Sequence, residues 1–140
     1  MKRLHVSFKV KDLQQSVTFY NTLFDQQPTV LKDDYAKWML EDPRVNFVLE
    51  QAEESGFSHA GIQVEAAGEL EPLFERMKSA EAPYLPEGVT TCCYHKSEKS
   101  WTADPDGVMW EAFLTHHETA AKGTETDEQL AAVATPRPCC

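Results

Sequence analysis

HVSFKVKDLQQSVTFYNTLF, at residues 5–24, changes its periodicity halfway along. Its first half alternates apolar and polar side chains, with Val6, Phe8 and Val10 on one side, which is typical of a strand with one buried face. Its second half follows Asp12, a good N-cap, and carries apolar residues at helical spacing. We therefore expect a strand that is followed directly by an amphipathic helix.

The same pattern begins again about 54 positions later. SHAGIQVE alternates like the first strand, a second amphipathic helix follows, and the shift lays His5 on His59 and Tyr20 on Phe74. Three short strands are predicted after each helix. They are Thr29–Lys32, Tyr35–Leu40, Val45–Glu50, Val89–Tyr94, Ser100–Ala103 and Val108–Thr115, with a turn at Asp104–Gly107 between the last two.

Repetition of this kind predicts an α+β protein built from two βαβββ modules. The modules span about 1–50 and 57–115, and we expect them to form a curved, partly open β-barrel-like cleft within one domain, residues 1–115. Residues 116–140 are rich in Ala, Thr, Glu and Pro and are predicted to be a mostly disordered tail.

Composition narrows the class of partner. The 140 residues carry a net charge of -10, which disfavours nucleic acid and anionic membranes because both require basic surfaces. No apolar run is long enough to span a bilayer, and the N-terminus lacks a signal-peptide pattern. We expect a cytoplasmic protein with reduced thiols that acts on a small molecule, and its oligomeric state stays open.

Three residues on separate predicted strands could bind a metal. Strand parity places His5 and His59 on the faces opposite the apolar side chains, and Glu111 lies among apolar residues in VMWEAFLTH. Two imidazoles and one carboxylate with open coordination positions form the facial triad of non-haem Fe(II) oxygenases. The alternative is structural, with each histidine satisfied in the core and Glu111 paired with Lys9.

TTCCYHKSEKSW contains the adjacent pair Cys92 and Cys93. Neighbouring cysteines make a strained disulfide that joins nothing distant. Two adjacent thiolates can instead chelate a soft centre such as trivalent arsenic, Cd(II) or Hg(II). The alternative is that one cysteine packs inward as a small apolar residue.

Chelation by neighbours requires a bend, since adjacent side chains in a regular strand point to opposite faces. Gly88 before the pair and the polar run HKSEKS after it predict a loop there. Lys96 and Lys99 would then lower the pKa of the thiols and favour the thiolate.

HVSFKVKDLQQSVTFYNTLF and DPDGVMWEAF resemble the opening and closing segments of the vicinal-oxygen-chelate superfamily, which includes glyoxalase I, bleomycin-resistance proteins and extradiol dioxygenases. The resemblance covers Met1 to about Thr115. More narrowly, DDYAKWMLEDPRVNFVLE, SHAGIQVE and TTCCYHKSEKSW resemble the organoarsenical C–As lyases of that superfamily, some of whose relatives carry a cadmium-induced-protein name.

This resemblance implies an Fe(II)-dependent dioxygenase with O2 as co-substrate. Such an enzyme cleaves the C–As bond of trivalent organoarsenicals, methylarsenite or reduced aromatic arsenicals, and releases arsenite. Carried over by position, His5, His59 and Glu111 match the metal ligands, and Cys92 and Cys93 match the pair that binds arsenic.

Other positions have further expected roles. Relatives in that family often place Gln at the position of His5, so this residue is expected to tune the choice of metal. Lys99 and Tyr94 are expected to support the site. Cys139 and Cys140 lie outside the resemblance and are either a dispensable end of the tail or a first site of arsenical capture.

Two rival functions stay open. A glyoxalase-type isomerase usually has four protein ligands, and the counterpart of Glu111 in the first module falls near Phe47-Val48, where no carboxylate occurs, although Glu50 could serve as the fourth ligand. A protein that only sequesters arsenite or Cd(II) would need the thiols but no open iron site.

Overall fold

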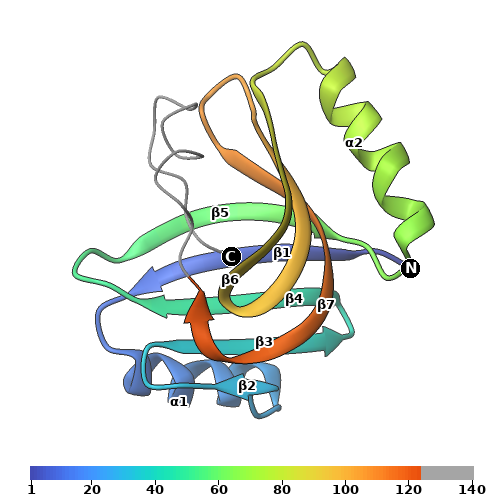
Figure 1. Ribbon diagram of the computed structural model, residues 1–140. Coiled ribbons are helices and arrows are strands. Elements are labelled where there is room, and N and C mark those ends of the chain that lie inside the picture. Colours follow the sequence, from blue (N-terminus) through green and yellow to red (C-terminus); the bar gives the residue numbers. More distant parts are fainter. Residues whose placement is uncertain (124–140) are drawn as a thin grey trace. The chain divides into compact units, whose positions relative to one another are not determined.

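The structure, a computed structural model, describes the backbone of residues 1–123 and their side chains except those of Cys92, Cys93 and residues 117–123. The chain divides into two compact units, one of Arg3–His59 and one that begins at Ala60 and includes Met1 and Lys2. Each unit combines strands with one α-helix (Figure 1), so the predicted α+β class is confirmed.

The first unit is the predicted βαβββ module. Its strands have the order β2-β3-β4-β1, in which β1 runs parallel to β4 and the other neighbours are antiparallel. Its elements are β1 (Arg3–Val10), α1 (Leu13–Phe24), β2 (Val30–Leu31), β3 (Tyr35–Glu41), β4 (Arg44–Gln51) and the start of β5 (Gly56–Gln63).

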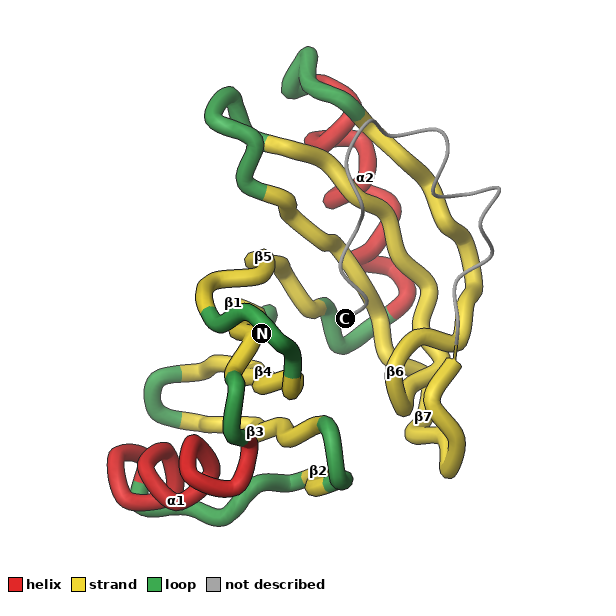
Figure 2. The backbone as a smooth tube through the Cα atoms, turned by 90° about the vertical axis from the view of Figure 1, so that its left-hand side faces the viewer, coloured by secondary structure: helices red, strands yellow, loops and turns green. Residues whose placement is uncertain are grey.

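Helix α1 covers one face of this sheet, as the tube in Figure 2 shows. Asp12 caps the helix by accepting a hydrogen bond from the backbone N–H of Gln15. The apolar core between helix and sheet is aromatic-rich, and Trp38 at its centre is fully buried. Its buried members are Leu13, Val17, Ala36, Trp38, Leu40, Phe47 and Leu49.

The other face of the same sheet carries several polar residues that are nevertheless buried. His5, Ser7, Lys37 and Asn46 lie there by strand parity, each less than a tenth exposed. Burying polar groups is costly unless they are hydrogen-bonded, so a buried polar face usually serves a site. This is the face predicted for His5.

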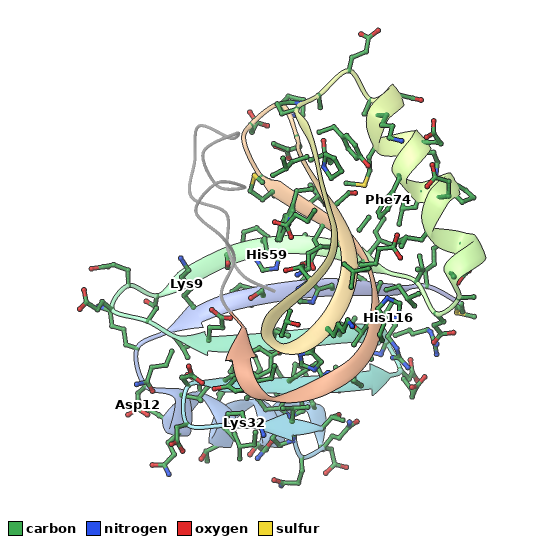
Figure 3. All side chains as sticks on the ribbon, viewed as in Figure 1. Lys9, Asp12, Lys32, His59, Phe74 and His116 are labelled. Atoms are coloured by element: carbon green, nitrogen blue, oxygen red, sulfur yellow. The ribbon has the colours of Figure 1, made fainter. Side chains whose placement is uncertain are left out.

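The second unit has the strand order β5-β7-β6, with β5 parallel to β7 and β6 antiparallel to β7. Its helix packs on Ala112 of β7, and Phe74 lies on the helix side that faces the strands (Figure 3). The elements are η1 (Ala67–Glu69), α2 (Leu70–Ser79), β6 (Tyr84–Ala103) and β7 (Met109–Gly123).

Strand β6 differs from the prediction. The segments Val89–Tyr94 and Ser100–Ala103 were expected as two strands with a loop between them, but they belong to one continuous strand. The loop prediction is wrong because His95, Ser97 and Lys99 alternate on a buried face. Their polarity hides the period of two that apolar residues would reveal.

The predicted turn at Asp104–Gly107 is confirmed. The Asp104 carboxylate accepts hydrogen bonds from the backbone N–H groups of Asp106 and Val108, and Gly107 has a φ of 87°, which favours glycine. Strand β7 continues past its predicted end at Thr115, to Gly123. Residues 116–123 of the predicted tail therefore belong to a strand, and the rest of that tail, residues 124–140 with Cys139 and Cys140, lies outside the described residues. Within residues 1–123, no helix has the length and apolar composition that crossing a bilayer requires.

Candidate metal centre

Two buried histidines face each other in the first unit. The Nε2 atoms of His5, on β1, and His59, on β5, are 3.1 Å apart, and their rings are tilted by 55° (Figure 3 labels His59). The side chains of both residues are almost completely buried. The predicted repeat therefore brings equivalent histidines together through their outer ring nitrogens.

The inner ring nitrogens are held by protein oxygens. His5 Nδ1 lies 3.2 Å from the backbone carbonyl oxygen of Asn46, its register partner on β4. A carbonyl can only accept, so Nδ1 carries the proton and Nε2 of a neutral His5 ring presents a lone pair. His59 Nδ1 lies 3.0 Å from the hydroxyl oxygen of Ser58.

This arrangement fits a divalent metal ion. Metal–nitrogen bonds to imidazole are about 2.1 Å long, so two nitrogens bound at right angles to one ion lie about 3.0 Å apart. The observed 3.1 Å matches that spacing. Metal-bound histidines also typically donate their second ring N–H to a carbonyl, carboxylate or other oxygen, as Asn46 and Ser58 allow here.

Glu111, the third predicted ligand, belongs to the second unit. It lies on β7 opposite Gly61 of β5, two residues after His59 in the chain. Its side chain is buried, and its carboxylate is 3.1 Å from Nζ of the equally buried Lys99 on β6. Its own unit thus supplies Glu111 with a cation, Lys99, whereas the structural partner considered from the sequence was Lys9.

The repeat also identifies the counterpart of Glu111 in the first unit. Gly61 pairs with Glu111 across β5 and β7, and the equivalent residue, Ser7, pairs with Val48 across β1 and β4. Val48 is fully buried and offers no donor atom. Glu50 lies two residues farther along β4, level with Lys9, so it does not occupy the equivalent position.

His5 and His59 thus belong to one unit, and Glu111 and Lys99 to the other. The structure brings together the two histidines, and separately the carboxylate and the lysine. One centre formed by His5, His59 and Glu111 stays a prediction.

The vicinal cysteines lie within β6. Cys93 pairs with Gly123, but the register shifts between Cys93 and His95, so Tyr94 sits at an irregularity of the ladder. This register shift is an irregularity of the strand, in place of the expected loop. Chelation of one ligand by Cys92 and Cys93 stays a prediction.

Two contributors to the site were missed by sequence reasoning, Ser58 and the backbone carbonyl of Asn46. Ser58 was not considered, because neighbours in a strand point to opposite faces and its contact with His59 has no periodic signal. The carbonyl of Asn46 is a backbone group that no side-chain pattern reveals. Lys99 was expected to support the site, and the structure places its ammonium group against the carboxylate of Glu111.

Comparison with known families and proteins supports the resemblance seen in the motifs. A sequence profile of the Glyoxalase/Bleomycin resistance protein/Dioxygenase superfamily matches residues 2–112. A relative from Bacillus sp. (strain MD1), named trivalent organoarsenical cleaving enzyme, is 41% identical over 121 residues, which cover 82% of this chain and 74% of the relative. A protein of the same name from Thermomonospora curvata is 30% identical over 151 residues, covering all of both chains.

The cadmium-induced protein CadI of Mycobacterium bovis is 31% identical over 127 residues, covering 88% of this chain and 84% of that protein. Solved structures with a similar fold include the Mn(II)-bound glyoxalase of Novosphingobium aromaticivorans, with a TM-score of 0.62 and 16% identity over 89% of this chain and 44% of that one. An extradiol ring-cleaving dioxygenase from B. fuscum has a TM-score of 0.63 and 13% identity over 84% and 33% of the two chains.

Sequence matches over most of the chain and fold similarity agree with each other. As its motifs predict, the chain belongs to the Glyoxalase/Bleomycin resistance protein/Dioxygenase superfamily.

Proposed function

We propose that this protein is an Fe(II)-dependent dioxygenase that cleaves the C–As bond of trivalent organoarsenicals and releases arsenite. The observation that carries the proposal is the His5–His59 pair, whose Nε2 atoms are 3.1 Å apart and whose Nδ1 atoms are both held by oxygens. Relatives named trivalent organoarsenical cleaving enzymes, at 30% and 41% identity, support the choice of substrate.

The proposed iron ligands are His5, His59 and Glu111. With Val48 at the position equivalent to Glu111, the repeat supplies three ligands where two complete modules would supply four. Fe(II) held by two histidines and one carboxylate keeps coordination positions open for O2 and substrate. The same argument disfavours a glyoxalase-type isomerase, which usually has four protein ligands.

Lys99 has a defined task in this scheme. Its ammonium group lies 3.1 Å from the Glu111 carboxylate, and both side chains are buried. A buried carboxylate without a cation is strongly disfavoured. Lys99 therefore compensates the charge of the Glu111 carboxylate and orients it for binding a metal.

Cys92 and Cys93 are the proposed arsenic ligands. Each thiol gives up its proton as one As–OH group of methylarsenite leaves as water, so two S–As bonds form without any change in oxidation state. Thiolates select soft centres such as trivalent arsenic. The register shift of β6 beside Cys93 supports this proposal, because bulges change the direction of neighbouring side chains and adjacent thiols need such a change to share one ligand.

A matched pair of measurements tests the proposal. The protein is loaded anaerobically with Fe(II), methylarsenite is added, and O2 uptake and arsenite release are followed after air is admitted. We expect both signals to depend on Fe(II) and on substrate. Binding of methylarsenite without O2 uptake or arsenite release would show a sequestering protein and contradict the proposal.

A further inference from the structure

Ser58 directly precedes the proposed ligand His59 on β5. It is half-buried, and its hydroxyl oxygen lies 3.0 Å from His59 Nδ1. A hydroxyl differs from the other oxygen in this network, the backbone carbonyl of Asn46, because it can either donate or accept a hydrogen bond.

His5 sets the constraint on the pair. Since the Asn46 carbonyl accepts from Nδ1–H, the Nε2 atom of a neutral His5 ring can only accept. His59 Nε2 lies 3.1 Å away. Two lone pairs at that distance repel each other, so either a proton or a metal ion must lie between them.

Each of these two states requires a different role for Ser58. Without a metal, His59 Nε2–H donates to His5 Nε2, His59 Nδ1 carries a lone pair, and the Ser58 hydroxyl donates to it. With a metal on both Nε2 atoms, the proton of His59 resides on Nδ1 and the Ser58 hydroxyl accepts. The change moves one proton between nitrogens through solvent, so no net proton is gained or lost.

We propose that Ser58 is a positioning residue whose hydroxyl reverses its hydrogen bond to let His59 exchange its ring proton for a metal ion. The part of this proposal that concerns the metal-bound state rests on the proposed function, because it assumes that His5 and His59 are metal ligands. The part that concerns the metal-free state, the proton position in the His5–His59 pair, depends on the observed contacts alone.

The first test measures ring protonation by 15N NMR of the full chain in alkaline buffer, in which imidazole rings are neutral. In the metal-free protein we expect the proton on Nδ1 of His5 and on Nε2 of His59. On addition of Zn(II), a diamagnetic probe that binds the same ligand types, the His59 proton should appear on Nδ1. A His59 ring protonated on Nδ1, or on both nitrogens, in the metal-free protein overturns the inference.

The second test compares Zn(II) affinity by calorimetry for Ser58→Ala, Ser58→Thr and Ser55→Ala. Loss of an oxygen partner to a metal-bound histidine typically weakens binding about 10-fold to 100-fold, which we expect for Ser58→Ala. Ser58→Thr keeps the hydroxyl and should bind like the wild type, as should Ser55→Ala, which removes an exposed hydroxyl before β5.

The outcomes separate this inference from the proposed function. Unchanged affinity in Ser58→Ala, with Zn(II) bound normally by the wild type, overturns the role of Ser58 and leaves the metal centre intact. Failure of the wild type to bind Zn(II) overturns both the metal centre and the proposed reversal of the Ser58 hydrogen bond on metal binding.

Discussion

His5 Nε2 and His59 Nε2 lie 3.1 Å apart, and the two residues are separated by the same shift that relates the two halves of the sequence. Residues at equivalent positions of the sequence repeat therefore contact each other in the structure. The Asn46 carbonyl accepts a hydrogen bond from Nδ1–H of His5, so Nε2 of a neutral His5 ring has a lone pair that points toward His59. The space between the two Nε2 atoms therefore favours a proton or a metal ion.

The first prediction concerns His5. His5→Ala removes a proposed ligand and should weaken Zn(II) or Fe(II) binding by roughly 100-fold or more, beyond the usual effect of losing an outer partner. His5→Gln retains a donor oxygen and should bind metal with an altered preference between metals. Calorimetry under anaerobic conditions measures both, with exposed His116→Ala as the control. Equal affinity of His5→Ala and His116→Ala would remove His5 from the site.

The second prediction uses Val48, the counterpart of Glu111. Val48→Glu adds a fourth donor to the proposed site, so metal binding should tighten by about tenfold or more. Arsenite release should fall, because a fourth ligand closes a position that O2 requires. Val48→Gln, similar in size but uncharged, controls for the disturbance of a buried position. Tighter metal binding with undiminished arsenite release would argue against the open-site account.

The third prediction concerns the buried ion pair of Lys99 and Glu111. Lys99→Met leaves a buried carboxylate without its cation and should lower the free energy of unfolding by about 3 kcal/mol. Adding a divalent metal should restore part of that loss, since the ion would replace the lost charge. Urea unfolding with and without Zn(II) measures both effects. The double variant Lys99→Met/Glu111→Gln, which lacks the uncompensated charge, should be less destabilised than Lys99→Met and should gain less stability from metal.

The fourth prediction separates arsenic binding from metal binding. Cys92→Ser and Cys93→Ser should each abolish arsenite release from methylarsenite and leave Zn(II) affinity unchanged, because the thiols and the metal ligands are different residues. Cys139→Ser/Cys140→Ser, in the part of the chain outside the described residues, is the matched control. Full activity in either single variant of the Cys92–Cys93 pair would exclude a two-thiol clamp.

The fifth prediction is a pH dependence of stability. The buried Arg3 guanidinium donates to Glu41, and this hydrogen bond lowers the pKa of that carboxyl below its usual range. A lowered pKa in the folded state stabilises the fold above the unfolded-state pKa, and the effect is lost as pH falls through the folded-state value. Wild type should therefore exceed Glu41→Gln in melting temperature at neutral pH, and the gap should close in strong acid.

Glu54→Gln, at an exposed position between β4 and β5, is the control for that comparison. A gap that stays constant down to strongly acidic pH would show that Glu41 acts through something other than its charge.

Much of the fold could be predicted because apolar side chains report their period. The alternation around Val6 and Phe8 and the helical spacing after Asp12 predicted β1 and α1 correctly, and parity placed His5 on the buried polar face. The loop predicted after Cys93 was wrong for the opposite reason. His95 and Lys99 are buried polar residues in β6, and no hydrophobicity pattern marks them as strand.

Details of the site depended on register and local contacts. Identifying Val48 as the counterpart of Glu111 requires the pairing of β1 with β4 and of β5 with β7, which a shift of the sequence gives only to within a residue or two. The contact of Ser58 with His59 arises from side-chain torsions, and the partner of Lys99 arises from a diagonal pairing across β6 and β7. None of these pairings and contacts produces a periodic pattern in the sequence.

Turnover of methylarsenite with and without Fe(II) tests the central claim most directly. The metal-stripped protein is divided, one half is reloaded with Fe(II), and arsenite release is measured in air and under argon. We predict arsenite only in the sample with both Fe(II) and O2, and none from a His59→Ala variant treated in the same way. Equal arsenite release without Fe(II), or from His59→Ala, would contradict the account.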